Sequence, residues 1–200
     1  MEEALESIFS QTYPNIEVFI VDDASKDESK DKINEIIAEY ELKTLQNYLP
    51  LKRIRIFNNP KNLGNCASFN RALVHAKGKY LIDFATDDIL MPTHIQTLVD
   101  VFEKLSKNVG VVFTNAMYVN ELSEDIKTHF QTNKQLQLIQ HIPQGEPKGF
   151  LFKDILDNYL ICAPTMMVKK EVFDNPKIGI KGYDVTLSYE DFDFRSKSVV

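Results

Sequence analysis

"IEVFIVDDAS", residues 16–25, is an apolar run rich in Ile, Val and Phe that ends on two adjacent carboxylates, Asp22 and Asp23. Such a run predicts a buried strand over residues 16–21. A second stretch, "YLIDFATDDIL" at residues 80–90, has the same plan and ends on Asp87 and Asp88. The central question is why two predicted strands should end in paired negative charges.

Helical periodicity surrounds these strands. A helix is predicted over residues 2–10, ended by Pro14, and Ser25 with Glu28 forms a capping box that predicts the start of a second helix. The later elements are, in order, a strand at 53–57, a helix at 66–76, a helix at 91–105 with Thr93 as its cap, and a strand at 109–114. Strands that alternate with helices predict an α/β fold: a mostly parallel central sheet with helices on both faces.

The alternation fades after residue 120. Residues 120–148 are polar and Gln-rich, which predicts a long loop, and order returns with a helix near 150–160 and a strand near 165–169.

The amino-acid composition limits the kinds of molecule that the chain is expected to bind and the compartment in which it works. The net charge of −6 offers no excess of positive charge to nucleic acid, and phosphates bound by such a chain need a cation to mediate. Cys66 and Cys162 form no CxxC motif, which agrees with a reducing cytoplasm. No apolar run approaches the ~20 residues that span a bilayer.

The acid pairs fall where open α/β sheets bind ligands, at the carboxyl ends of strands. Two neighbouring carboxylates repel each other unless a positive group compensates them, and Mg²⁺ or Mn²⁺ could bridge them to substrate phosphates. Solvated turn residues are the alternative explanation for either pair alone. Neither a P-loop nor a GxGxxG motif occurs, so a metal-bridged nucleoside diphosphate fits better than a nicotinamide.

A third acidic cluster, "SYEDFDFRSK" at residues 188–197, contains Glu190, Asp191 and Asp193. Acids are favoured at a helix N-terminus by the helix dipole, which is one explanation. The other is that one of these acids is a general base.

Four stretches together resemble the family-two inverting glycosyltransferases: "ALESIFSQTYPNIEVFIVDDASKD" (4–27), "NPKNLGNCASFNRAL" (59–73), "AKGKYLIDFATDDILMP" (76–92) and "YEDFDF" (189–194). The resemblance implies a GT-A fold and transfer of a sugar, with inversion, from a nucleotide sugar to an acceptor hydroxyl. A UDP-sugar is the favoured donor. A carbohydrate or lipid-linked acceptor in bacterial cell-surface polysaccharide synthesis is implied, in the cytoplasm at the inner face of the membrane.

The resemblance also implies roles for the acids. Asp22 and Asp23 match the pair that contacts the base and ribose of the nucleotide. The family's metal motif, Asp-any-Asp, matches residues 85–87, where Ala85 replaces the first acid. Asp87 and Asp88 are then expected to divide ribose and metal contacts between them, with Mn²⁺ or Mg²⁺ as the cation. Asp191 matches the catalytic base, with Glu190 as the alternative.

By the same resemblance, residues 1–200 form one catalytic domain, with a nucleotide-binding part at 1–115 and an incomplete acceptor-side part at 116–200. Family members begin with a strand before the helix that opens this chain. A fragment lacking that central strand and the C-terminal part is therefore expected, with unpaired strand edges.

Three other functions are compatible with parts of the sequence. Ala85 favours a non-catalytic module that binds sugar nucleotides or carbohydrates. "FIVDDAS" and "DDILMP" resemble a signalling receiver domain, although a receiver begins with its acidic strand and not with a helix. A nucleotidylyltransferase is disfavoured because no basic, Gly-rich N-terminal loop is present.

Overall fold

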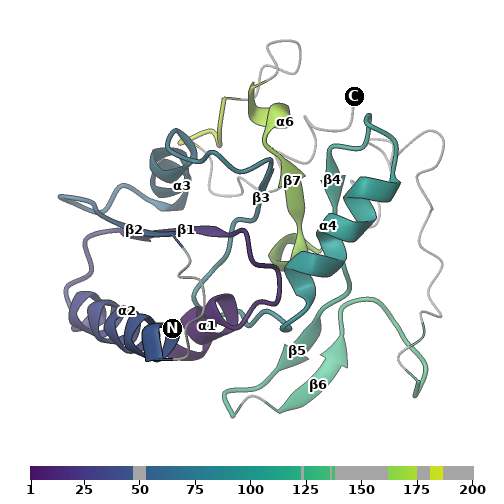
Figure 1. The fold of residues 1–200 in the computed structure, drawn as a ribbon, viewed down its shortest axis with the longest axis horizontal. Coiled ribbons are helices and arrows are strands. Elements are labelled where there is room, and N and C mark those ends of the chain that lie inside the picture. Colours follow the sequence, from purple (N-terminus) through teal and green to yellow (C-terminus); the bar gives the residue numbers. More distant parts are fainter. Residues whose placement is uncertain (47–52, 123, 136, 138–161, 175–180, 187–200) are drawn as a thin grey trace.

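The computed structural model describes residues 1–46, 53–122, 124–135, 137, 162–174 and 181–186 (Figure 1). Its helices are α1 (Glu2–Phe9), α2 (Ser29–Gln46), α3 (Asn65–Leu73), α4 (His94–Lys104) and α6 (Glu171–Asp174), with a 3₁₀ turn at Ala163–Thr165. Its strands are β1 (Glu17–Asp22), β2 (Arg53–Asn58), β3 (Tyr80–Leu81), β4 (Val111–Val112), β5 (Met117–Val119), β6 (Asp125–Thr128) and β7 (Met167–Lys169). The predicted helix at 150–160 lies outside the described residues.

The first sheet joins β1 and β2 in parallel, from Glu17 opposite Arg53 to Asp22 opposite Asn58. Figure 1 shows α3 on one side of this pair and α1 with α2 on the other. An apolar face of α2 packs here, because Ile33, Ile36 and Ile37 form a buried cluster with Leu5 of α1. A parallel pair covered by helices on both faces confirms the predicted α/β class.

The second sheet has the strand order β3-β7-β4. The predicted strand near 165–169 is confirmed as β7, which runs antiparallel to both neighbours, with Val168 opposite Leu81 and Val111. β3 and β4 therefore point in the same direction. α4 covers this sheet through a cluster of Leu98, Val99 and Phe102 with Val112 and Met167.

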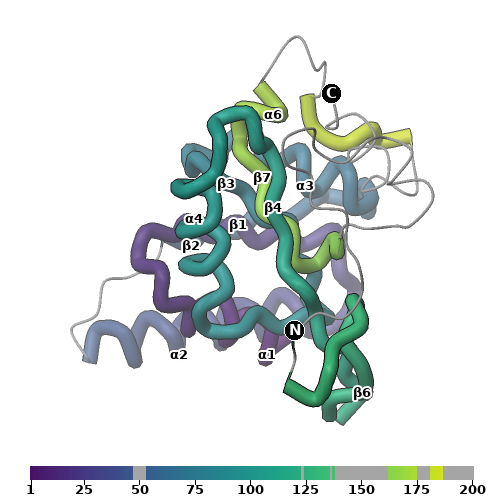
Figure 2. Tube along the Cα trace, turned by 90° about the vertical axis from the view of Figure 1, so that its right-hand side faces the viewer, coloured from purple at the N-terminus to yellow at the C-terminus, as the bar shows by residue number. Residues whose placement is uncertain are grey.

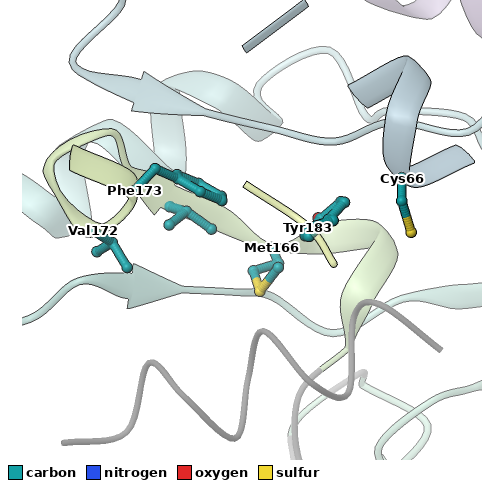
Figure 3. Close-up of a cluster of buried hydrophobic side chains, with 6 residues drawn as sticks. Cys66, Met166, Val172, Phe173 and Tyr183 are labelled. Carbon is teal, nitrogen blue, oxygen red and sulfur yellow. The ribbon is translucent and has the colours of Figure 1, made fainter. Parts of the chain in front are cut away.

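A third cluster joins α3 to the C-terminal elements. Figure 3 shows Met166, Val172, Phe173 and Tyr183 gathered beside the helix that carries Cys66. The Tyr183 ring stacks on Phe69 of α3 with centroids 4.3 Å apart. Segments more than 100 residues apart in sequence therefore share one core, as Asn70 and Tyr183 also show.

The hairpin β5–β6 was not predicted. Met117 pairs with Thr128 in an antiparallel ladder, in which β5 directly precedes the predicted loop at 120–148 and β6 lies inside it. Figures 1 and 2 place this hairpin at the opposite end of the molecule from α6. Residues 138–148 of the predicted loop lie outside the described part of the chain.

The predicted capping box is wrong. α2 begins at Ser29, not directly after Ser25, because the Ser25 N–H donates to the Asp22 carboxylate and the Ser29 N–H donates to Asp27. Thr93 occupies the predicted cap position of α4 but makes no capping bond through its side chain. Within the described residues, no helix has both the length and the apolar character needed to cross a membrane.

Candidate active site

Asp22 ends β1 with its side chain only 2% exposed. The Ser25 N–H donates to both carboxylate oxygens at 3.3 Å, and Lys30 Nζ lies 3.4 Å from Oδ2. Burial raises the pKa of Asp22, but the contacts from Ser25 and Lys30 outweigh it and leave the pKa below its usual value. Asp22 is therefore an ionised carboxylate whose charge the protein itself compensates.

Asp23 holds the loop that follows β2. Its Oδ1 accepts hydrogen bonds from Asn59 Nδ2 at 2.7 Å and from the Leu63 N–H at 2.8 Å, and its Oδ2 accepts from the Gly64 N–H at 2.8 Å. Burial raises the pKa of Asp23, but these donors together bring it below the usual value. The backbone next to these bonds adopts positive φ angles, +86° at Gly64 and +63° at Ala24.

Asn59 was missed as a site residue. Besides its bond to Asp23, its side-chain amide donates to Ser68 Oγ at 3.0 Å, and its N–H donates to the Asp22 carbonyl at 2.8 Å. Arg71 donates to the Asn59 side-chain oxygen and lies over the Phe57 ring. The available signal was the position of Asn59 directly after β2, which matches the position of Asp23 directly after β1.

Asp87 and Asp88 lie in a tight turn after β3, closed by a 3.3 Å bond from the Asp88 N–H to the Ala85 carbonyl. Asp87 is exposed and Asp88 is half-buried. Burial raises the pKa of Asp88, and the negative charge of Asp87 raises it further. Within the described residues, no hydrogen bond or ion pair compensates either carboxylate. The two pairs therefore differ: hydrogen bonds and Lys30 stabilise the charges of Asp22 and Asp23, whereas the environment of Asp88 disfavours its charge.

Ser7 of α1 and Gln11, two residues after the end of α1, hold the segment that follows this turn. Ser7 Oγ accepts from the Leu90 N–H, and Gln11 bonds both the Met91 carbonyl and the Ile95 N–H. His94, at the start of α4, is buried, and its Nε2 has no hydrogen-bond partner among the described residues. Burial lowers its pKa, so the ring is favoured in its neutral form.

Asp191, the predicted base, and Glu190, its alternative, lie outside the described residues. The described segment before them, 181–186, is held by Asn70 of α3. Asn70 Nδ2 donates to the Tyr183 carbonyl, and its Oδ1 accepts from the Tyr183 N–H, both at 2.8 Å. Gly182 permits this approach, since a Cβ there would collide with the Asn70 side chain. The Asn70 side chain therefore acts as a clamp that holds the backbone of Tyr183 through two hydrogen bonds.

A hard divalent cation fits the donor set at residues 87–88. Two carboxylates with no compensating group in the described structure supply the oxygen ligands that Mg²⁺ or Mn²⁺ takes alongside water and substrate phosphate. No group of three or more His, Cys, Asp or Glu side chains able to hold a metal occurs among the described residues. The protein ligands from this part of the chain would then be one or two carboxylates.

Comparison with known proteins identifies the family to which this chain belongs. The sequence model described as "Glycosyl transferase family 2" matches residues 1–174. An uncharacterized glycosyltransferase from Methanocaldococcus jannaschii is 28% identical over 97% of this chain and 58% of its own length. Another, from Rickettsia prowazekii, is 29% identical over 96% of this chain and 52% of its own length.

A solved structure shares the fold. The mannosyltransferase from Pyrobaculum calidifontis, in complex with GDP-Man and Mn²⁺, superposes with a TM-score of 0.60 at 17% identity, covering 98% of this chain and 47% of that one. The chain belongs to glycosyltransferase family 2, and its fold is of the GT-A type. It spans about half the length of the curated relatives that it matches along most of its length.

Proposed function

We propose that this chain carries the donor-binding part of an inverting glycosyltransferase, which transfers a sugar from a nucleotide sugar to an acceptor hydroxyl with the help of Mn²⁺ or Mg²⁺. The observation that carries the proposal is the contrast between the two strand-end acid pairs. Asp22 and Asp23 are compensated and held, whereas Asp87 and Asp88 repel each other without a described partner. A cation bound with a pyrophosphate would relieve that repulsion.

Each pair has its own role in this proposal. Asp22 and Asp23, at the end of β1, position the base and ribose of the nucleotide. Hydrogen bonds from Asn59 and Gly64 hold this strand end in place. Asp87 and Asp88 hold the cation and the ribose, with the division between them open. When bound, the cation supplies Lewis-acid stabilisation of the leaving nucleoside diphosphate.

The proton transfer is assigned to residues outside the described structure. Asp191, with Glu190 as the alternative, accepts the proton of the acceptor hydroxyl as the oxygen attacks the anomeric carbon. A positioned general base contributes typically ~10²–10⁴-fold to the rate. The clamp between Asn70 and Tyr183 supports this assignment, because it ties residue 183 to the helix that follows the Asp23-bound loop.

The division of the chain follows the same scheme. Residues 1–115 form the nucleotide-binding part of one catalytic domain, and residues 116–200 belong to the acceptor side. The proposed acceptor is a carbohydrate or a lipid-linked sugar in cell-surface polysaccharide synthesis, at the cytoplasmic face of the membrane.

The test is a thermal-shift screen of UDP and GDP, each with and without Mn²⁺. We expect UDP to raise the unfolding temperature only when the cation is present. Equal shifts without Mn²⁺ would refute the metal-bridged site. A larger shift with GDP would replace the UDP assignment.

A non-catalytic sugar-nucleotide module remains the second candidate, because Ala85 replaces an acid of the family's metal motif. Asp191→Asn in the full-length protein separates the two. Loss of transfer with unchanged donor binding supports the enzyme. Donor binding without transfer in the unmodified full-length protein, with any donor, supports the module.

A further inference from the structure

Arg71 of α3 contacts the end of β2 and the residue that follows it. Its Nη1 donates one hydrogen bond to the Asn58 carbonyl at 2.8 Å and another to Asn59 Oδ1. Its guanidinium carbon lies 5.2 Å from the centroid of the Phe57 ring, within the range of a cation–π contact. These contacts hold the guanidinium directly beside the Asn59 amide.

The Asn59 amide is hydrogen-bonded at both of its ends. Its oxygen accepts from Arg71, and its nitrogen donates to Asp23 Oδ1 at 2.7 Å and to Ser68 Oγ at 3.0 Å. Asn59 and Ser68 are both buried. Ser68 lies three residues before Arg71 in α3, and residues at this spacing share one face of a helix. One face of α3 therefore contacts both ends of the amide.

The direction of these bonds allows the amide a single orientation. A guanidinium only donates hydrogen bonds, and a carboxylate only accepts them. Asn59 must therefore turn its oxygen toward Arg71 and its nitrogen toward Asp23. Rotating the amide by half a turn would place its NH₂ group against the guanidinium and its oxygen against the carboxylate, and would break the hydrogen bonds to both charged groups.

The Asp23 carboxylate depends on this orientation. Within the described part of the chain, no hydrogen bond or ion pair joins Arg71 to Asp23 directly, so Asn59 connects them. Asp23 in turn accepts hydrogen bonds from the Leu63 N–H and the Gly64 N–H, both at 2.8 Å. A change in the direction of the amide would therefore alter the carboxylate and the loop that it holds.

We propose that Arg71 is a positioning residue of the donor site, which fixes the Asp23 carboxylate through Asn59 and makes no contact with the nucleotide itself. This role rests on the proposed function, in which Asp22 and Asp23 position the base and ribose. A carboxylate that is already held in one direction does not have to be ordered when the nucleotide binds, which lowers the entropic cost of binding. Loss of the guanidinium should therefore weaken donor binding although the nucleotide loses no direct contact.

The first test needs no ligand. Arg71→Met keeps an unbranched side chain but removes every hydrogen-bond donor. Amide hydrogen exchange, measured by NMR, compares the Gly64 N–H and the Asn59 side-chain NH₂ with the Thr97 N–H, which bonds the Thr93 carbonyl within α4. Relative to Thr97, we expect the Gly64 and Asn59 protons to exchange about tenfold faster in the variant.

Arg55→Met is the matched control. The Arg55 guanidinium also lies over a ring of the first sheet, 5.7 Å from the Phe19 centroid, and its removal changes the net charge equally. It makes no hydrogen bond or ion pair within the described residues, so exchange at Gly64 and Asn59 should stay unchanged. Arg71→Lys keeps the charge and one donor group. It should restore part of the protection, and it replaces Arg71→Met if that variant does not fold.

The second test measures the Kd of UDP in the presence of Mn²⁺ by isothermal titration calorimetry. We expect Arg71→Met to raise this Kd about threefold to tenfold and Arg55→Met to leave it unchanged. Combining Arg71→Met with Asn59→Ala should raise the Kd little further than Asn59→Ala alone, because both changes break one connection to Asp23.

The proposal is overturned if Arg71→Met leaves the exchange at Gly64 and Asn59 unchanged, if Arg55→Met accelerates it equally, or if Arg71→Met binds UDP like the unmodified chain. Full additivity with Asn59→Ala also overturns it, because Arg71 would then act independently of Asn59. Failure of the proposed function gives a different result. The unmodified chain would bind neither UDP nor GDP, which removes the role of Arg71 in donor binding, while the exchange rates still decide whether Arg71 holds Asp23.

Discussion

Asn59 Nδ2 lies 2.7 Å from Asp23 Oδ1, and this hydrogen bond joins the ends of β1 and β2. The backbone N–H of the same asparagine donates a hydrogen bond to the Asp22 carbonyl. One buried side chain therefore holds the corner at which the nucleotide is proposed to bind, without being an acid itself.

Asn59→Ala should lower the free energy of unfolding by about 1–3 kcal/mol, because the half-buried Asp23 and the buried Ser68 each lose a hydrogen-bond donor. Urea unfolding at neutral pH measures this. Asn108→Ala, at an exposed position, is the control and should change stability by less than about 0.5 kcal/mol. Equal effects of the two variants would contradict the role of Asn59.

Acid should remove the contribution of the Asp23 carboxylate to the free energy of unfolding. Its pKa is lowered in the folded state, so its stabilisation is complete above the unfolded pKa and is lost as the pH falls through the folded pKa. Asp23→Asn should therefore be less stable than the unmodified chain at pH 7, and the difference should shrink as the pH falls below the usual carboxyl range. Urea unfolding across pH 7 to pH 2 tests this, and a pH-independent difference would refute it.

Ala24→Gly should stabilise the chain by about 1 kcal/mol, because φ +63° is unfavourable for a residue with a Cβ. Ala67→Gly, inside α3, is the matched control and should destabilise by about 0.5–1 kcal/mol. Thermal or urea unfolding distinguishes the two signs. A loss of stability in both variants would mean that Ala24 is not strained.

Asp88→Asn should raise the stability of the ligand-free chain at neutral pH, because it removes the repulsion from Asp87. The same change should abolish stabilisation by Mn²⁺ with a nucleoside diphosphate, which for a bound ligand at 100 times its Kd is about 2.7 kcal/mol. Asp125→Asn, exposed on β6, should show neither effect. A variant of Asp88 that keeps the full Mn²⁺ response would assign the metal to other residues.

Gly182→Ala should disrupt the clamp between Asn70 and Tyr183, since its Cβ would collide with the Asn70 amide. We expect a loss of about 1–3 kcal/mol. Combining it with Asn70→Ala should cost little more than either change alone, since both break one interaction. Full additivity in this double-mutant cycle would show that the two residues act independently.

The elements of the first 115 residues could be predicted because their signals are local. Ile33, Ile36 and Ile37 repeat at helical spacing, and they are buried as that spacing indicates. The β5–β6 hairpin could not be predicted in this way, because Met117, Tyr118 and Val119 are all exposed and form no apolar face. The antiparallel insertion of β7 is a long-range pairing that no local pattern encodes.

At the site, the sequence identified the acids but not what surrounds them. The partners of Asp23 lie 36 to 41 residues away, so their bonds follow from the fold and not from spacing. The capping box failed for a related reason: Asp22 competes for the Ser25 N–H. Residues 190–191, outside the described structure, stay a prediction.

The clamp on Asn70 also has a consequence for synthesis on the ribosome. Tyr183 is translated 113 residues after Asn70, a delay of roughly 6 to 23 s at typical elongation rates. Throughout that interval the Phe69 ring has no Tyr183 to cover it. The nascent chain therefore offers a transient apolar surface that chaperones can recognise, and codon-dependent pauses between these positions would lengthen its exposure.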